Sequence, residues 1–422
     1  MRTPLAHSAR KNYPPQTYEA HVRGVCERAG KYAAEAECYS VKANGILSTI
    51  VRDSALLHDL GKLEERNQSV LREQSRRRRH LPVDHTDAGS AALQKMGSGC
   101  AAMLVYSHHQ GLPDLSTEFA ARGCSIFRNG NAEVRAETDA ALPALLRQHE
   151  ALFPRKPNKE VQAYDGDPAV FLRMALSCLA DADHGDTAAA FGQTEKAMPE
   201  LRPQERLTAL DHYVSKFGET DERSSLRREL YQSCRSAEAH SGFSVCGSPV
   251  GSGKTTAVMA HLLEQACKRN ARRIFVVLPY TSIIRQSVDI YRKALVLPGE
   301  TPEDVVAELH SRADFEDIET RYLTALWRAP IVVTTAVAFF ETLSSHNPAA
   351  LRRLHELPGS LIFVDEAHSA LPIRLLPLAW HWMNVLADEW SCYWVLASGS
   401  LVRYWELQPL SGLSMPQPEI AE

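Results

Sequence analysis

The chain has 422 residues, enough for two or three domains, and its 44% hydrophobic and 23% charged residues are typical of a globular protein. Its net charge of −4 excludes a protein that binds nucleic acid through an overall positive charge. Any contact with DNA must therefore come from a local group of side chains. Nine cysteines without a C-x-x-C pair, no signal peptide and no apolar run of about 18 residues predict a cytoplasmic protein without a membrane span.

Periodicity divides the chain into two halves. Residues 1–200 predict an all-α domain, because segments 47–60 (LSTIVRDSALLHDL) and 169–184 (AVFLRMALSCLADADH) carry apolar residues at helical spacing. Residues 201–240 are charged and mostly helical, so we interpret them as a connector. In residues 241–422 short apolar runs alternate with helical stretches, which predicts an α/β domain built on a parallel sheet.

In the first of these segments His58 directly precedes Asp59, in the run ALLHDLGK. His58 lies on the apolar face of its predicted helix, where a buried imidazole needs a polar partner, and both side chains can reach a metal ion between them. The alternative is an ordinary helix end, with both side chains in water, Gly61 as the C-cap and Lys62 near the last carbonyl groups.

Further imidazoles and carboxylates occur in separate helical segments of this half. They are His21, His85, the adjacent His108 and His109, and Asp183. Asp183 continues an apolar stripe of its helix and is expected to face inward, whereas Asp181 is turned away from that stripe. Imidazole and carboxylate ligands suit Fe, Mn, Co, Ni or Zn, and two such ions about 4 Å apart could activate a water molecule to hydrolyse a phosphodiester.

The order of these residues resembles that of the HD-domain phosphohydrolases and, in more detail, of the HD nuclease domain in the CRISPR-associated helicase-nuclease of type I systems. The resemblance implies two metal ions ligated by His21, His58, Asp59, His85, His108, His109 and Asp183. It also implies that Lys62 acts at the scissile phosphate, for which the alternative is a cation at a helix end. Asp181 competes with Asp183, because the run DADH can be aligned with a shift of two residues.

The run SPVGSGKTT, between the apolar run GFSVCG and the helical run AVMAHLLEQ, predicts a phosphate-binding loop. Backbone N–H groups of such a loop point at phosphate oxygens, while Lys254 would reach the β- and γ-phosphates and Thr255 would hold Mg²⁺. The nucleotide-binding candidates here are Ser248, Gly251, Ser252, Gly253, Lys254, Thr255 and Thr256, with Ser248 in place of the usual first glycine.

A second nucleotide motif, LIFVDEAHS, ends an apolar strand with two carboxylates. Asp365 at the strand tip would bind Mg²⁺, Glu366 would polarise the attacking water and His368 would couple the site to the sheet. Together with the phosphate-binding loop, this motif resembles the superfamily-two helicases of the DEAH type.

Two other runs extend the resemblance to the type I CRISPR helicase over nearly the whole chain: VLPYTSIIRQSVDIY and IVVTTAVAFFETL. By that resemblance, residues at DNA-tracking motifs would hold single-stranded phosphates without reading bases; the alternative is ordinary strand-end turns. These residues are Pro279, Tyr280, Thr281, Thr334 and Thr335. The arginine run at 76–79 is either a solvated loop or a phosphate-contacting patch.

The sequence therefore predicts an HD nuclease domain followed by one RecA-like lobe, acting in CRISPR interference. The HD domain would cut single-stranded DNA with two metal ions, and the lobe would bind ATP with Mg²⁺ and DNA. The resemblance implies the guide-RNA surveillance complex as a partner. The run LASGSL stands where such helicases usually carry Ser-Ala-Thr, and the chain ends soon after it. We therefore also expect ATP binding without efficient hydrolysis unless a second RecA-like lobe is added in trans.

Two alternatives stay open. One is a small-molecule HD phosphohydrolase, which needs a closed pocket, with the phosphate-binding lobe as a regulatory switch. The other is a non-catalytic remnant or adaptor.

Overall fold

The computed structural model describes residues 2–10, 12–73, 80–158, 163–193, 196–218, 221–239, 242–249, 251–309, 327–367, 370, 375–399 and 419–421. The chain forms two compact units. The helical unit comprises Met1–Glu195 and Ser345–His355, and the sheet unit comprises Lys196–Ser344 and Glu356–Glu422. The arginine run at 76–79 and His368 lie outside the described residues.

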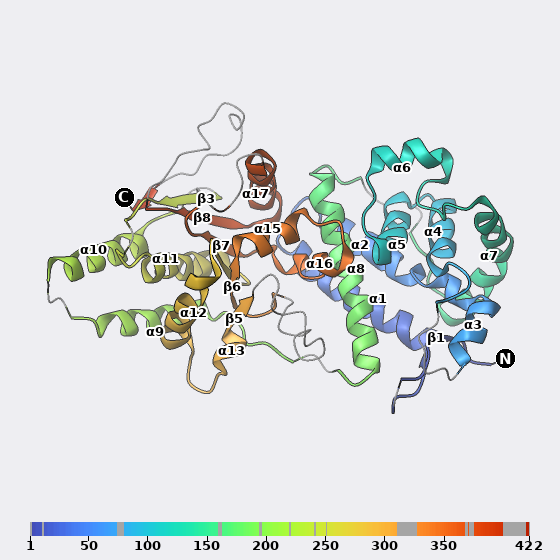
Figure 1. The fold of residues 1–422 in the computed structure, drawn as a ribbon, viewed down its shortest axis with the longest axis horizontal. Helices are drawn as coiled ribbons and strands as arrows, with labels where there is room; N and C mark the ends of the chain where they lie inside the picture. The colour runs from blue at the N-terminus through green and yellow to red at the C-terminus, as the bar shows by residue number, and fades with distance from the viewer. Residues whose placement is uncertain are drawn as a thin grey trace. The chain divides into compact units, whose positions relative to one another are not determined.

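The helical unit is a bundle in which α1, α2, α5 and α8 pack on one another (Figure 1). Its helices are α1 (Tyr18–Glu37), α2 (Ile46–Leu57), α3 (Glu65–Arg72), α4 (His85–Lys95), α5 (Gly99–Gln110), α6 (Leu115–Arg122), α7 (Ala132–Leu152), α8 (Pro168–Ala190) and α16 (Pro348–Leu351), with a 3₁₀ turn η1 (Leu60–Leu63). A short antiparallel pair, β1 (Leu5–His7) and β2 (Gln16–Thr17), precedes α1.

Local sequence accounts for where the key helices begin and end. The Thr17 side chain accepts a hydrogen bond from the backbone N–H of Ala20 and so caps α1, while Asp167 caps α8. Helix α2 ends at Leu57, and Asp59 leaves the helical conformation with φ −112° and ψ 17°. On an unbroken helix the two adjacent side chains would point about 100° apart; here His58 Nε2 lies 3.3 Å from Asp59 Oδ2.

The sheet unit contains a seven-stranded sheet of order β5-β6-β4-β7-β8-β3-β9 among the described residues, and every pair of neighbours is parallel. The strands are β3 (Phe243–Cys246), β4 (Ile274–Leu278), β5 (Val306–Leu309), β6 (Ile331–Thr335), β7 (Leu361–Val364), β8 (Tyr393–Ala397) and β9 (Glu419–Ala421). The helices are α9 (Pro203–Ser215), α10 (Glu222–Ser236), α11 (Lys254–Arg269), α12 (Thr281–Leu295), α13 (Pro302–Val305), α15 (Ala336–Ser344) and α17 (Leu376–Trp390). The predicted fold class, a helical bundle followed by an α/β lobe, is confirmed.

Helices cover both faces of this sheet, because its strands are apolar on both sides. Along β4, Ile274 and Val276 belong to the core shared with α9, α10, α11 and α12. Phe275, between them, points to the other face, where its ring lies 6.0 Å from that of Phe339 on α15. The parallel strands all end at one edge, so the loops after β3, β7 and β8 are brought together there.

Two features differ from the sequence-based division of the chain. Residues 201–240, the predicted connector, group with the sheet unit, and residues 345–355, predicted to belong to the α/β domain, group with the helical unit. Strand β5 was not predicted, because its four residues (VAEL) include a glutamate and directly follow a helical turn. The domain limits themselves stay a prediction.

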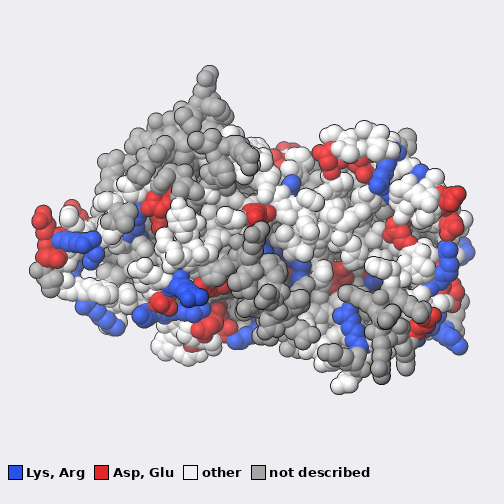
Figure 2. Space-filling view, viewed as in Figure 1, with Lys and Arg blue, Asp and Glu red and all other residues white. Residues whose placement is uncertain are grey.

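Charge is mixed on the surface. On the face shown in Figure 2, acidic and basic side chains are intermingled over α10 and elsewhere on the described residues, without one large basic area. A DNA contact on this face would therefore rest on individual side chains and backbone amides, as the net charge suggests. None of the described helices is long and apolar enough to cross a membrane.

Candidate functional site

Asp59 is the centre of the candidate metal site in the helical unit. Its Oδ2 atom lies 3.1 Å from His21 Nε2, 3.3 Å from His58 Nε2 and 2.6 Å from Lys62 Nζ. Its Oδ1 atom lies 3.6 Å from His85 Nε2. The two oxygens of this buried carboxylate thus face two different sets of donors, which is the arrangement of a ligand shared by two metal ions.

The two donor sets can be stated separately. The donor atoms of His21, His58 and Asp59 all lie within 4.8 Å of one another, and so do those of Asp59, His85, His108 and His109. His85 reaches this position because Gly61 has no side chain: a Cβ there would lie 2.7 Å from the backbone of His85. Gly61 therefore has a packing role beyond the helix cap that the alternative interpretation assigns to it.

Asp183 and Asp181 have different partners. Asp183 Oδ1 lies 3.3 Å from His21 Nε2 and thus joins the first donor set. Asp181 is fully buried and accepts hydrogen bonds from Arg352 Nε at 3.0 Å and Nη2 at 2.7 Å. Two positions along α8 are about 200° apart around the helix axis, so these two carboxylates cannot serve the same site.

Three histidines are held with the same ring atom facing inward. The Nδ1–H groups of His58 and His108 donate to the main-chain carbonyl three residues earlier, at 2.8 and 2.7 Å. Nδ1 of His21 lies 2.8 Å from a carboxylate oxygen of Asp186. With Nδ1 as the donor, the Nε2 atoms of His58 and His108 can act as metal ligands. His21 Nε2 lies 3.3 Å from His58 Nε2, so these two rings present the same atom to one place.

Asp186 was missed by sequence reasoning, although it lies one helical turn after Asp183. It approaches His21 because Gly24 leaves space: a Cβ at Gly24 would lie 1.9 Å from Asp186 Oδ1. Gln16 Nε2 also donates to Asp186 Oδ2 at 2.7 Å. A carboxylate that orients a ligating imidazole is a common outer partner of metal sites.

We expect Gly24→Ala to weaken metal binding about 10- to 100-fold, because the new methyl group pushes Asp186 away from His21. Isothermal titration with Mn²⁺ would measure the affinity. Gly99→Ala is the matched control, since a Cβ at Gly99 meets no atom within 4 Å. Equal affinities of the two variants would show that Asp186 does not orient His21.

The donor set fits a transition metal ion. Asp59 Oδ1, His85 Nε2 and His108 Nε2 are buried and have no hydrogen-bond partner among the described residues. Unpaired polar atoms in the interior are costly, and a cation between them would satisfy all three. Nitrogen and carboxylate donors without thiolates suit Fe, Mn, Co, Ni or Zn, in agreement with the predicted metals.

The protonation states of Asp59, His85 and His108 match metal ligation, whereas His21 must lose a proton to bind a metal ion. Burial lowers the pKa of His21, but its hydrogen bonds to Asp183, Asp186 and Asp59 raise it to about 10. Burial raises the pKa of Asp59, but the nearby His58 and Lys62 hold it well below its usual value. Burial lowers the pKa of His108 well below its usual value and that of His85 to about 4. A charged carboxylate and neutral imidazoles are the forms that bind metal ions.

In the sheet unit, the loop after β3 has the geometry of a phosphate-binding loop. Gly251 and Gly253 have φ of +82° and +88°, which only glycine adopts without strain. Ser248 Oγ donates to Ser252 Oγ at 2.6 Å, and Ser252 Oγ donates to the Pro249 carbonyl at 2.7 Å. The two hydroxyl groups thus close the loop ahead of α11, whose N-terminus favours phosphate.

The strand-end motifs meet at the same edge. Lys254 Nζ lies 3.8 Å from Asp365 Oδ1 and 3.5 Å from Glu366 Oε1, and Ser398 Oγ donates to Glu366 Oε2 at 3.1 Å. Thr255 and Thr256 occupy the first turn of α11. Lysine, hydroxyl and carboxylate groups around one loop can hold a nucleotide triphosphate with Mg²⁺.

Helix α10, in the predicted connector, also contributes to this loop. Nε of Arg227 donates to the Gly251 carbonyl at 3.1 Å, and a Cβ at Gly251 would lie 2.8 Å from an Nη2 atom of Arg223. Neither arginine could be predicted from the sequence, because α10 carries several charged residues and nothing in its sequence separates these two from side chains that face solvent.

The predicted DNA-tracking residues differ in their exposure to solvent. Tyr280 is 60% exposed and Thr281 is also exposed, so both can meet a strand. Thr334 is fully buried, and Thr335 Oγ1 accepts from the Ala338 N–H at 3.1 Å, capping α15. Both threonines end strand β6 and are buried, so neither hydroxyl group faces solvent.

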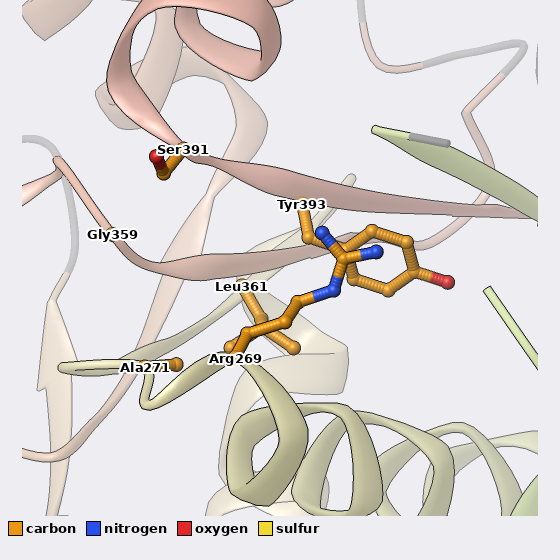
Figure 3. A pocket seen from close by; sticks show the side chains of 6 residues that line it. All are labelled: Arg269, Ala271, Gly359, Leu361, Ser391 and Tyr393. Carbon is orange, nitrogen blue, oxygen red and sulfur yellow. The ribbon is translucent and has the colours of Figure 1, made fainter. Parts of the chain in front are cut away.

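A cavity of about 250 Å³ lies at the opposite edge of the sheet (Figure 3). It lies where β7 and β8 begin, between Leu361, Ser391 and Tyr393, and the Arg269 guanidinium covers the Tyr393 ring at 4.4 Å. Because the phosphate-binding loop follows the other end of β3, this cavity is separate from the nucleotide motifs.

Comparison with known proteins adds the family context. Residues 231–374 match the DEAD/DEAH box helicase family. No curated protein matches the chain. Among solved structures, T. fusca Cas3 with AMPPNP matches with a TM-score of 0.58 and 18% identity, over 97% of this chain and 52% of that one. T. fusca Cas3 with ATP matches with a TM-score of 0.57 and 17% identity, over 98% and 55%.

The chain thus spans about half the length of the Cas3 chains that it matches. At such identities the likeness concerns the fold, and it extends over both units. The resemblance inferred from the motifs is therefore confirmed at the level of fold: this chain has the fold of the part of T. fusca Cas3 that it spans, and its residues 231–374 match the DEAD/DEAH box helicase family.

Proposed function

We propose that the helical unit is a two-metal HD nuclease that cuts single-stranded DNA, and that the sheet unit binds ATP and DNA during CRISPR interference. The observation that carries the proposal is Asp59, whose two oxygens face two sets of histidines. The metal ligands predicted from sequence come from five separate segments of the chain, and each lies beside Asp59 or beside a residue that contacts it.

Each residue of the centre has a distinct part in hydrolysis. When bound, a pair of transition metal ions supplies a water of lowered pKa and stabilises the charge on the phosphate. His58, Asp59 and Asp183 would be the core ligands shared by the two ions. His85, His108 and His109 would complete the ligand set of the second ion. Lys62, whose Nζ lies 2.6 Å from Asp59, can turn to contact a phosphate oxygen.

The substrate is proposed to be a polynucleotide because two histidines of the centre reach solvent. His109 is exposed and the His85 side chain is 20% exposed, whereas His21, His58 and Asp59 are buried. A phosphodiester within a strand can approach from the His109 side without entering an enclosed pocket. A small-molecule phosphohydrolase, the alternative, would enclose its substrate.

In the sheet unit, Lys254 and Thr255 would hold the ATP phosphates and Mg²⁺, with Asp365 as the second Mg²⁺ ligand and Glu366 positioning water. The guide-RNA surveillance complex and a second RecA-like lobe acting in trans are the partners that we propose for the chain. Both follow from the resemblance of its motifs to the type I helicase-nuclease.

The direct test is cutting of circular single-stranded DNA by the purified chain loaded in turn with Mn²⁺, Co²⁺, Ni²⁺, Fe²⁺ and Zn²⁺, with metal content measured by elemental analysis. We expect two ions per chain and cutting without ATP. A folded protein that binds metal, leaves DNA intact and hydrolyses nucleotides would favour the small-molecule alternative.

Lys254→Ala should weaken binding of a fluorescent ATP analogue about tenfold or more and leave ATP-independent cutting of single-stranded DNA unchanged. The reason is that Lys254 faces the nucleotide phosphates, while the nuclease water is activated by ligated metal ions. Lys268→Ala, at the exposed end of the same helix, is the control and should bind nucleotide normally. Loss of cutting in the Lys254 variant would contradict independent action of the two sites.

A further inference from the structure

His7 lies beside the metal centre although its position in the chain did not suggest a site. Its ring centroid lies 4.8 Å from that of His21, with the rings nearly perpendicular. Donor atoms of His7, His21 and Asp183 all lie within 4.8 Å of one another. His7 thus forms a third donor set, which shares two residues with the proposed metal ligands.

The strand that carries His7 is fixed to the bundle. Leu5 donates its N–H to Gln68 Oε1 at 2.9 Å and accepts from Gln68 Nε2 at 2.8 Å. Ser8 Oγ donates to the Leu71 carbonyl at 2.9 Å. These bonds on either side of His7 attach β1 to α3 and so hold the imidazole against the centre.

Further contacts link the same hairpin to α8 and α1. His7 Nε2 lies 3.2 Å from Thr187 Oγ1. Leu5 pairs with Thr17, which caps α1, and Gln16, the partner of His7 in the pair, donates to Asp186. When His7 donates its Nε2–H to the Thr187 hydroxyl, Nδ1 keeps its lone pair for a metal ion.

We propose that His7 is a further metal ligand, binding the ion on the His21–Asp183 side of the centre. This inference rests on the proposed function of the helical unit. Donor–metal distances of about 2.1 Å place two ligand atoms of one ion about 3.0 Å apart in cis positions and about 4.2 Å apart in trans positions. Donor atoms that already lie within 4.8 Å of one another can therefore reach one ion by side-chain shifts of about 1 Å. Octahedral metal ions have room for this additional nitrogen.

Binding by His7 would make the N-terminal strand part of the metal site. The strand would then lie over the ion on the His21 side, while the His109 side stays open to DNA. Metal loading and ordering of residues 2–10 should therefore be linked, which amide hydrogen exchange on either side of His7 can measure.

His7→Phe tests the ligand role, because phenylalanine keeps an aromatic ring beside His21 and Phe191 and lacks a donor atom. In Co²⁺ titrations of the full chain we expect one of two ions to bind about 10- to 100-fold more weakly, with a changed visible spectrum. His212→Phe, at an exposed histidine of α9, is the control. Unchanged affinity and spectrum in the His7 variant would overturn the proposal.

His7→Cys gives a readout that a merely structural role would not produce. A thiolate that replaces the imidazole on Co²⁺ adds a ligand-to-metal charge-transfer band in the near ultraviolet, absent from the unaltered protein, and should restore part of the affinity lost in His7→Phe. Absence of this band in a folded, metal-loaded variant would overturn the proposal.

The failures of the two proposals can be told apart. If the unaltered chain binds two ions and cuts single-stranded DNA while both His7 variants behave like it, only the role of His7 is wrong. If the unaltered, folded chain binds no transition metal, the proposed function fails and the role of His7 fails with it.

Discussion

Asp59→Ala is expected to abolish metal binding and metal-dependent cutting of single-stranded DNA while the helical unit stays folded. Both carboxylate oxygens face donor sets, so the substitution removes a ligand from each ion at once. Changes to the outer partners of metal ligands already cost about 10- to 100-fold, so the loss of this shared ligand should exceed about 100-fold. Elemental analysis, Mn²⁺ titration and the circular-DNA assay would measure it.

The control is Asp165→Ala, which removes an exposed carboxylate of the same unit. Thermal unfolding followed by circular dichroism would show whether the Asp59 variant is folded. Because Asp183 faces His21, Asp183→Ala should lose activity in the same way. Full metal content and cutting in the Asp59 variant would refute the shared-ligand interpretation.

Arg352→Leu is expected to destabilise the helical unit by about 3–5 kcal/mol, because it removes the guanidinium from the fully buried Asp181 carboxylate. His355 Nε2 lies 3.8 Å from the other Asp181 oxygen, beyond hydrogen-bond distance. Amide hydrogen exchange along α8 would measure the local loss, since the two units need not unfold together.

Two further variants make this expectation specific. Arg23→Leu breaks an exposed ion pair with Glu19 on α1 and should cost no more than about 1 kcal/mol. The double variant Asp181→Leu with Arg352→Leu should be more stable than Arg352→Leu alone, because no buried charge is left uncompensated. A loss in Arg352→Leu no larger than that in Arg23→Leu would show that residues 345–355 are not anchored through Asp181.

The sequence by itself determined the order of elements and the motifs at their ends. Apolar residues at helical spacing predicted α2 and α8, and short apolar runs predicted β3, β4, β6, β7 and β8, because such periodicities are local properties of the chain. The phosphate-binding loop and the carboxylates after β7 could be predicted for the same reason. Their meeting at one edge follows from parallel strands alone.

Only the tertiary structure decided which of the isolated polar residues belong together. His7 is in a three-residue strand, and Asp186 is close to His21 because Gly24 leaves space, neither of which a periodicity reveals. Asp181 and Asp183 are equivalent in the run DADH, and the contact of Asp181 with Arg352, far away in the chain, separates them. Such contacts depend on how helices pack across long sequence separations, and that packing has no local signal in the sequence.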